Sequence, residues 1–274
     1  MFAVYGKVLI CKNRRVARIP KICHILFITI MQAIILAGGY GTRLYPLTIN
    51  APKPMIEVGG RPMIEYLIDK LRNISEISEI FIVSNDKFAH VFDEWLKKSH
   101  YSNIHIINDG TTSNEDRLGS VGDVQYVLDH AHVDEDLMII GGDNFVEDNF
   151  QNIVANFHQK WNIIGLYDVG DIEYVKQLGH PVLDESMRIT SLIEKPSEPT
   201  SSLASTLVYI LKNTDLHWIK TVIESGKADR AGDLIAFLCQ KEEVYGSVLQ
   251  WQWFDIGTLE QLKKAEEWVK NQNK

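Results

Sequence analysis

Short apolar runs alternate with longer segments of helical periodicity along the first half of the chain. The apolar runs predict buried strands, and the segments in which apolar residues recur at positions i, i+3 and i+4 predict helices. The expected strands are 32–37, 79–84, 103–107 and 136–141, and the expected helices are 62–73, 88–99 and 119–131. Because strands that alternate with helices are typical of parallel sheets, we expect an α/β fold. Its mostly parallel central sheet should carry helices on both faces.

The pattern changes in the second half, where short β-like runs replace the regular alternation. A helix at 149–160 and a strand at 162–168 are followed by β-like runs at 180–184, 188–194 and 203–211, and then by helices at 213–225, 231–240 and 258–271. We interpret this half as a smaller subregion built on the same central sheet. The prediction is a single domain at 31–274, with one half at 31–148 and the other at 149–274.

A glycine-rich loop follows the first predicted strand and carries two cations. Gly38, Gly39 and Gly41 come directly after the strand, and Arg43 and Lys53 follow. Glycines let backbone N–H groups approach phosphate oxygens closely, and the two cations neutralise phosphate charge. The sequence therefore predicts a phosphate-binding loop.

Other interpretations of this loop fit less well. A plain tight turn between a strand and a helix would also use glycines. A dinucleotide-binding turn needs a further glycine three residues after the second one, where this chain has Leu44. Pro46, Pro52 and Pro54 also argue against a helix that starts at once. A Walker loop is excluded because no Gly-Lys-Ser/Thr follows.

Two aspartates are candidate metal ligands. Asp143 follows the predicted strand 136–141, and ligands of open α/β sheets bind beyond the carboxyl ends of the strands. Asp255 stands among apolar neighbours in a predicted, partly buried strand, where a carboxylate needs a cation or a hydrogen-bond partner. A turn or a helix cap would explain either residue by itself. Together they favour a shared Mg²⁺ ion held against phosphates.

Four motifs in order carry a family resemblance. L-A-G-G-Y-G-T-R-L-Y-P-L-T at 36–48, followed by P-K-P, resembles the opening of the sugar nucleotidyltransferases, also called nucleoside-diphosphate-sugar pyrophosphorylases. G-D-N at 142–144, E-K-P at 194–196 and W-F-D-I-G-T at 253–258 follow in the order of that family. The resemblance covers roughly 31–270 and is to glucose-1-phosphate thymidylyltransferase-like enzymes. It implies a Rossmann-like fold of the nucleotide-diphospho-sugar transferase type, with an acceptor-binding second half.

The resemblance implies an Mg²⁺-dependent transfer of a nucleotidyl group from a nucleoside triphosphate to a sugar 1-phosphate, which yields an activated sugar for glycan synthesis and pyrophosphate. It assigns catalytic roles to Arg43 and Lys53 and metal binding to Asp143 and Asp255. The implied nucleotide-binding residues are Leu36, Ala37, Gly38, Gly39, Gly41, Thr42, Arg43 and Gly119. The implied sugar-phosphate-binding residues are Gly179, Glu194 and Lys195. The attacking phosphate is largely ionised at neutral pH, since its second pKa is about 6, so no general base is needed.

Departures from the family pattern leave the base and the acceptor open. The segment L-G-S-V-G-D at 118–123 is nearer to uridylyl- and guanylyltransferases than to thymidylyltransferases. Leu207 replaces a family glycine, and Leu178-Gly179 replaces a Tyr-Gly pair. A cytidylyltransferase that acts on a non-sugar phosphate such as phosphocholine is one alternative. A non-catalytic regulatory paralogue is another, although the expected cationic and acidic residues are present.

Charge and cysteine content limit the other possibilities. The formal net charge of −8 disfavours nonspecific nucleic-acid binding, and the apolar runs are too short for a membrane span. Residues 1–30 contain basic side chains but no acidic ones, and we expect them to be an extension outside the core rather than a signal peptide or an added strand. The basic residues are Lys7, Lys12, Arg14, Arg15, Arg18 and Lys21. Because Cys239 is the only cysteine of 31–274, a cytoplasmic location is expected, and a homo-oligomer is plausible.

Overall fold

The computed structural model describes residues 30–147 and 149–272, so the predicted extension 1–30 lies almost entirely outside the described residues. One nine-stranded sheet dominates this part of the chain and runs in the order β10-β9-β11-β6-β1-β4-β5, with β8 beside β11 and β12 beside β8. The strands are β1 (Met31–Leu36), β4 (Ile77–Ser84), β5 (Ile104–Asn108), β6 (Asp136–Gly141), β8 (Ile163–Asp168), β9 (Gly179–Leu183), β10 (Ile189–Glu194), β11 (Leu203–Leu211) and β12 (Tyr245–Val248). The predicted α/β fold is confirmed.

Strand direction divides the sheet into two regions. The block β6-β1-β4-β5 is parallel throughout, with Ile34 of β1 opposite Phe81 on one side and Ile139 on the other. Strand β11 runs antiparallel to both β6 and β8, and it joins the second half of the chain to the first. The parallel block brings the carboxyl ends of β1, β4, β5 and β6 to one edge of the sheet.

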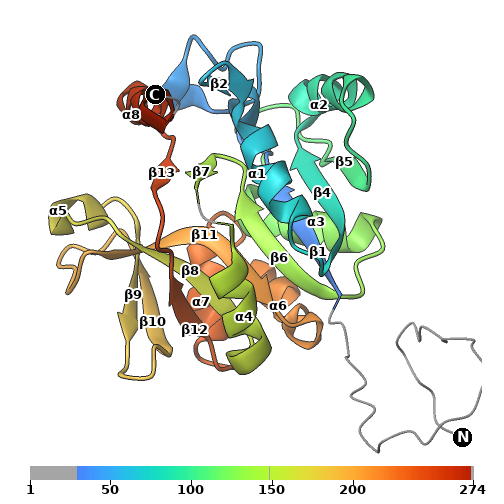
Figure 1. Cartoon of the computed structure of the whole chain (residues 1–274). Coiled ribbons are helices and arrows are strands. Elements are labelled where there is room, and N and C mark those ends of the chain that lie inside the picture. The colour runs from blue at the N-terminus through green and yellow to red at the C-terminus, as the bar shows by residue number, and fades with distance from the viewer. Residues whose placement is uncertain (1–29, 148, 273–274) are drawn as a thin grey trace, which may run out of the picture.

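Helices cover both faces of the sheet, as predicted (Figure 1). Along β1, Ala33 and Ile35 pack with α1 and α4, whereas Ile34 packs with α3, α6 and α7. Because a central parallel strand is buried on both faces, it needs the continuous apolar run that the sequence supplies. The helices are α1 (Met63–Arg72), α2 (Asp86–Lys98), α3 (Gly119–His130), α4 (Gln151–Lys160), α5 (Ile172–Val175), α6 (Trp218–Glu224), α7 (Ala231–Leu238) and α8 (Leu259–Gln272).

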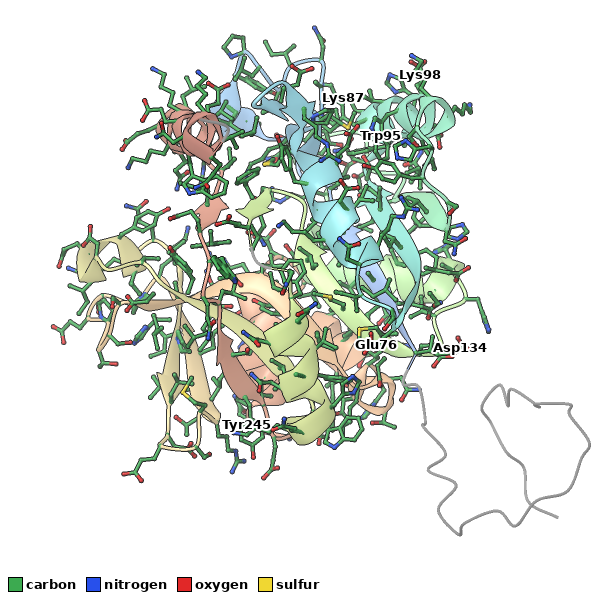
Figure 2. The ribbon with its side chains drawn as sticks, viewed as in Figure 1. Glu76, Lys87, Trp95, Lys98, Asp134 and Tyr245 are labelled. Carbon is green, nitrogen blue, oxygen red and sulfur yellow. The ribbon has the colours of Figure 1, made fainter. Side chains whose placement is uncertain are left out.

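Side-chain contacts fix the helices to each other and to the sheet. The Asn85 side chain caps α2 by accepting a hydrogen bond from the backbone N–H of Phe88. The indole of Trp95 on α2, labelled in Figure 2, donates to Glu65 of α1 at 2.9 Å. These contacts hold α1 and α2 firmly beside the parallel block.

Several short elements differ from the predicted pattern. The predicted helix 213–225 is a 3₁₀ turn, η3 (Asn213–Asp215), followed by α6. Strand β12 was not predicted, since its glycine and serine interrupt the apolar pattern. Two small sheets pair β2 (Glu57–Val58) with β3 (Arg61–Pro62) and β7 (Asn144–Val146) with β13 (Trp253–Asp255). Strand β13 confirms the strand predicted around Asp255.

No helix among the described residues has the length and apolar character needed to cross a membrane. The last helix, α8, instead returns to the first half of the chain and packs beside β2 (Figure 1). Its apolar side chains join Leu44 and Phe145 in a small separate core. This core lies under the loop that follows the glycines, so the end of the chain supports the site.

Candidate active site

The glycine loop leaves β1 at the carboxyl edge of the parallel block. Gly38 is buried, and its carbonyl accepts a hydrogen bond from the Asn85 side chain at 2.8 Å, which ties the loop to the end of β4. Gly39 is exposed, and a side chain there would meet no neighbouring atom within 4 Å. The loop therefore combines a fixed base with an accessible backbone, as a phosphate-binding loop requires.

Gly41 turns the loop into a short 3₁₀ helix, η1 (Thr42–Leu44). Its φ of +60° lies in the left-handed region, and a Cβ atom there would lie 3.0 Å from the Thr48 side chain. Thr48 closes the turn by donating from its hydroxyl to the Gly41 carbonyl at 2.7 Å. Leu44 is buried, whereas Thr42 and Arg43 point outward and are exposed. The loop thus presents Arg43 to solvent from an anchored turn.

Lys53 lies in a second 3₁₀ turn, η2 (Lys53–Met55), between two buried prolines. Its Nζ atom is 2.7 Å from Oδ2 of Asp143, and only 15% of its side chain is exposed. Close packing around Gly142, where there is no room for a side chain, places Asp143 at this position. A Cβ atom there would lie 2.8 Å from the Leu36 carbonyl and 2.9 Å from the Pro54 ring. Close packing of three segments therefore brings Lys53 and Asp143 together.

Strand pairing brings Asp255 to the same place. In the β7–β13 pair Asp255 lies opposite Asn144, and the N–H of Ile256 donates to the Asp143 carbonyl at 3.2 Å. Burial and, to a smaller extent, the nearby Asp143 carboxylate raise the pKa of Asp255 to about 6, although Lys53 and Arg43 act to lower it. The four charged residues predicted from the sequence, Arg43, Lys53, Asp143 and Asp255, thus form one cluster.

Asn144 holds the small β7–β13 sheet in place. Its side-chain amide donates to the Thr206 carbonyl on β11 at 2.6 Å, and its side-chain oxygen accepts from the Trp253 indole at 3.0 Å. Asn144 is buried, so these bonds are shielded from water. The positions of both carboxylates therefore depend on an amide that lies between them and the main sheet.

The carboxylate pair fits a divalent cation that also binds phosphates. Burial penalises the Asp255 charge, and a cation would offset that penalty. The described residues contain no group of three or more His, Cys, Asp or Glu side chains that could form a metal site by themselves. Mg²⁺ is usually held by one or two carboxylates together with substrate phosphates and water. Asp143 and Asp255 match this arrangement.

The residues predicted for the sugar phosphate form a second cluster. Glu194 of β10 lies opposite Gly179 of β9, and its Oε1 atom is 2.9 Å from where a Cβ of Gly179 would be. The same oxygen is 1.8 Å from the corresponding point at Gly232 of α7, so neither glycine can carry a side chain while Glu194 stays in place. Burial raises the pKa of Glu194, Arg230 and Lys195 oppose the rise, and Asp233 adds to it. Lys195 itself is exposed.

Gly119 begins α3 at a close contact between the two halves of the chain. Its φ is +79°, and a Cβ atom would lie 2.4 Å from Cα of Asp229. The N–H groups of Ser120 and Val121 donate to the carbonyls of Asp229 and Ala228 at 3.0 and 2.9 Å. The glycine is thus required by packing, and contact with a nucleobase stays a prediction.

Sequence reasoning missed two buried aspartates beside the glycine loop. A Cβ atom at Gly38 would lie 2.6 Å from Oδ2 of Asp123 and 3.1 Å from Oδ2 of Asp109. Each aspartate is only 6% exposed. The signal was the spacing on α3, because Asp123 follows Gly119 by four residues and lies on the same helix face. For Asp109, only the folded sheet reveals the contact.

Most of the chain is similar to known proteins. The profile of a family described as "Nucleotidyl transferase" matches residues 32–272. The chain is 29% identical over 241 residues to the bifunctional protein GlmU of Methanocaldococcus jannaschii, covering 87% of this chain and 54% of that protein. It is 29% identical over 243 residues to the UTP–glucose-1-phosphate uridylyltransferase AglF of Haloferax volcanii, covering 86% and 96%. It is 28% identical over 231 residues to the mannose-1-phosphate guanyltransferase of Saccharomyces cerevisiae, covering 83% and 61%.

Solved structures share the fold. A putative glucose-1-phosphate thymidylyltransferase from Bacillus anthracis superposes with a TM-score of 0.77 at 24% identity, covering 88% of this chain and 96% of that one. A UDP-glucose pyrophosphorylase solved with UDP-glucose gives a TM-score of 0.76 at 16% identity, covering 89% and 100%. The chain spans about half the length of the GlmU proteins that it matches.

Proposed function

Because this chain belongs to the nucleotidyl transferase family, we propose that it transfers a nucleotidyl group from a nucleoside triphosphate to a sugar 1-phosphate. The products are a nucleoside-diphosphate sugar and pyrophosphate. The observation that carries this proposal is the cluster of Arg43, Lys53, Asp143 and Asp255 beside the glycine loop. Two of the relatives named above, a uridylyltransferase and a guanyltransferase, have names that specify a sugar 1-phosphate, which supports this proposal.

The chain's residues would act by positioning and charge rather than by proton transfer. The attacking phosphate is already largely ionised at neutral pH, because its second pKa is about 6. The backbone of 38–42 and Arg43 would hold the triphosphate, and Lys53 would stabilise the charge that develops around the α-phosphate. The two polyanions repel each other, so holding them in line accounts for much of the expected rate enhancement.

Asp143 and Asp255 would hold a Mg²⁺ ion. When bound, the ion offsets negative charge on the phosphoryl oxygens. In the structure Lys53 supplies positive charge next to Asp143. A Mg²⁺ ion would bind beside the same carboxylate. Burial and the neighbouring Asp143 carboxylate raise the pKa of Asp255, and a bound cation would offset both effects.

The second cluster would bind the acceptor. Glu194 can accept hydrogen bonds from sugar hydroxyls, and exposed Lys195 can hold the sugar phosphate. Gly179 and Gly232 leave the space that the carboxylate of Glu194 occupies. This arrangement suits a hydroxylated acceptor, whose hydroxyl groups can donate to the carboxylate.

Pyrophosphate release tests the function directly. Purified protein with Mg²⁺ is incubated with each nucleoside triphosphate in combination with sugar 1-phosphates and phosphocholine. Release with one nucleotide and one sugar 1-phosphate is the expected result. Release only with phosphocholine would show that the acceptor is a non-sugar phosphate. Nucleotide binding without release in any combination would favour a regulatory protein and contradict the proposal.

Two further parts of the proposal are the cellular location and the oligomeric state of the protein. Cys239 is half-buried, and burial raises the pKa of its thiol to about 11, which keeps it protonated and unreactive. A cytoplasmic location suits such a protein, and cell fractionation tests it. We also propose a homo-oligomer. Light scattering of the purified protein tests this, because a molar mass equal to that of one chain would contradict it.

A further inference from the structure

Leu207 has a backbone conformation that is unusual for a leucine inside a strand. Its φ of +53° lies in the left-handed region, where residues other than glycine are strained. The residue lies at the irregularity in the pairing of β11 with β8, between Ser205 and Tyr209. Backbone strain of this kind is concentrated at active sites and ligand sites. A glycine would relieve the strain, which points to a role for the leucine side chain.

Hydrogen bonds from both neighbouring segments enforce this turn of the backbone. The Asn144 side-chain amide donates to the carbonyl of Thr206 at 2.6 Å and to that of Leu207 at 3.3 Å. On the other side, the hydroxyl of Thr206 donates to the carbonyl of Gly165 on β8 at 2.9 Å. Because the backbone is held from two sides, the direction in which the Leu207 side chain leaves the strand is fixed.

The side chain of Leu207 reaches the proposed metal ligand Asp143. Its Cδ1 atom is 3.6 Å from the point that a Cβ atom of Gly141 would occupy, and Oδ1 of Asp143 is 2.8 Å from the same point. Gly141 ends β6 at the carboxyl edge of the parallel block. Leu207 packs against the core on this face of the sheet but is only partly buried. A methyl group of Leu207 therefore lies beside the carboxylate.

The proposed sugar-binding carboxylate lies on the other side of β11. Ser205, two residues before Leu207, pairs with Gly179, and its Cβ atom is 3.6 Å from the point that a Cβ of Gly179 would occupy. Oε1 of Glu194 is 2.9 Å from that point. Strand β11 lies between β9 and β6 in the sheet, so Leu207 stands between the cluster around Glu194 and the one around Asp143.

We propose that Leu207 limits the size of the acceptor next to its phosphate, and that the acceptor is a sugar 1-phosphate with a hydroxyl, not an acylated amine, on C2. This inference rests on the proposed function, which places the acceptor phosphate beside Asp143 and the sugar hydroxyls at Glu194. The leucine between these groups then faces the carbons nearest to the phosphate.

The chemistry of the sugar ring identifies the group that the leucine meets. The anomeric carbon has two neighbours in the ring, the ring oxygen and C2. The ring oxygen carries no substituent, so the group on C2 is the one whose size differs between sugars at this place. The isobutyl side chain of Leu207 is about as large as an acetyl group, and a packed site tolerates such added volume poorly. A hydroxyl on C2 is small enough to fit beside the leucine.

Paired substrates test this inference on the full chain. The value of kcat/KM for pyrophosphate release is measured with the 1-phosphates of glucose, galactose and mannose and with their 2-acetamido counterparts, each with the nucleoside triphosphate that the protein uses. Within the pair that is used best, we expect the hydroxyl form to be favoured by a factor of about ten or more. A preference of the unaltered protein for the acetamido form overturns the inference, and this result needs no variant.

Variants of Leu207 show whether its side chain causes the preference. Leu207→Gly removes the side chain and suits the left-handed backbone, and Leu207→Ala removes most of the side chain and keeps the backbone strain. Each should raise the relative kcat/KM of the acetamido form about tenfold, mainly by lowering its KM. Leu207→Met conserves the volume and should keep the ratio of the unaltered protein. An unchanged ratio in both smaller variants, with their fold intact by circular dichroism, contradicts the assignment.

Met187→Gly is the matched control. Met187 also has a positive φ, +68°, is partly buried and packs against the same core. It precedes β10, whereas Glu194 ends that strand, so it lies away from the proposed acceptor. The variant makes the same kind of change as Leu207→Gly and should leave the ratio between the two forms unchanged. A change as large as that in Leu207→Gly would show that the ratio follows a general loosening of the core, and it would overturn the inference.

The outcomes separate this inference from the proposed function. If pyrophosphate is released with a sugar 1-phosphate but the ratio does not respond to Leu207, the function stands and the role of the leucine is wrong. If no sugar 1-phosphate supports release, the proposed function fails, and the inference fails with it.

Discussion

Lys53 and Asp143 form a 2.7 Å ion pair, although the proposed reaction needs both groups at the phosphates. Burial and the Asp143 carboxylate raise the pKa of Asp255, and the positive charge of Lys53 opposes this rise. Because a buried charge without a partner is costly, the ion pair holds the carboxylates in place in the protein alone. In the proposed function Asp143 and Asp255 would hold Mg²⁺ and Lys53 would stabilise charge around the α-phosphate, so each partner of this ion pair has a second role.

Neutralising either proposed metal ligand should remove most of the activity. Asp143→Asn and Asp255→Asn keep side-chain shape but lose the charge that would hold Mg²⁺, and we expect kcat to fall by a factor of about 10² to 10³. Steady-state pyrophosphate release at several Mg²⁺ concentrations measures the effect. Asp93→Asn, an exposed aspartate on α2, is the control and should behave as the unaltered protein. Full activity in either test variant contradicts the metal assignment.

Asp123 should make the stability of the protein depend on pH. Its pKa is raised from 3.8 to about 8 in the folded protein by burial and by Asp109, so the unfolded chain releases this proton more readily. Its contribution to the free energy of unfolding is therefore fully present below pH 3.8 and is lost as the pH rises to about 8. One group contributes a slope of at most about 1.4 kcal/mol per pH unit.

Asp123→Asn isolates this contribution, because the amide does not titrate. Urea unfolding at pH 5, 6.5, 8 and 9 should show the variant gaining stability relative to the unaltered protein up to about pH 8, with a constant difference above it. A difference that does not change between pH 5 and pH 8 would show that Asp123 has an ordinary pKa in the folded protein.

At the scale of elements, the site depends on how short strands are attached to the main sheet. Strand β7 carries Asn144 directly after Asp143, and β13 ends with Asp255. Neither strand belongs to the nine-stranded sheet, and each is only three residues long. The side chain of Asn144 bonds them to β11, and Val146 and Trp253 also pack in the core of the main sheet. This buried amide therefore helps to fix the geometry of both carboxylates.

Removing that amide should loosen the small sheet. Asn144→Ala leaves the Trp253 indole and the Thr206 carbonyl without these partners in a buried place, which costs about 1–3 kcal/mol for each group. For a protein of this size we expect a fall in Tm of about 4–8 °C for a loss of 2 kcal/mol. Calorimetry measures it, with the exposed α4 variant Asn152→Ala as a control that should change Tm little. An unchanged Tm in Asn144→Ala would show that β11 and β13 hold β7 without the amide.

At the scale of the whole molecule, local pattern predicted more of the fold than of the site. The continuous apolar run of β1 and the helical spacing of α1 and α3 are properties of neighbouring residues, so the sequence reveals them. The pairing of Asp255 with Asn144 and the contact of Asp109 with Gly38 join residues far apart in the chain, and no local pattern encodes them. The motif resemblance supplied Arg43, Lys53, Asp143 and Asp255 together, and the structure explains their grouping.

One departure from the family pattern also has a visible consequence. Leu207, which replaces a glycine, has a φ of +53°, so the backbone of β11 keeps a conformation that glycine adopts more easily. It lies at an irregularity in the pairing of β11 with β8, between Ser205 and Tyr209. The backbone at Leu207 is therefore in the left-handed region that a glycine would favour, although the side chain is a leucine.

The two predicted halves should unfold as one cooperative unit. Val208 of β11 pairs with Ile140 of β6, Asp255 pairs with Asn144, and the start of α3 bonds to the carbonyls of 228–229, so three separate contacts join 31–148 to 149–274. Each half leaves part of the shared sheet uncovered when the other unfolds, which disfavours a stable intermediate. Hydrogen exchange in increasing urea, followed separately for β4 in the first half and β8 in the second, should give one common midpoint. A fragment of residues 31–148 should fail to fold when expressed without the rest. Two distinct midpoints, or a folded fragment, would show that the halves are independent domains and that the site lies at an interface able to open.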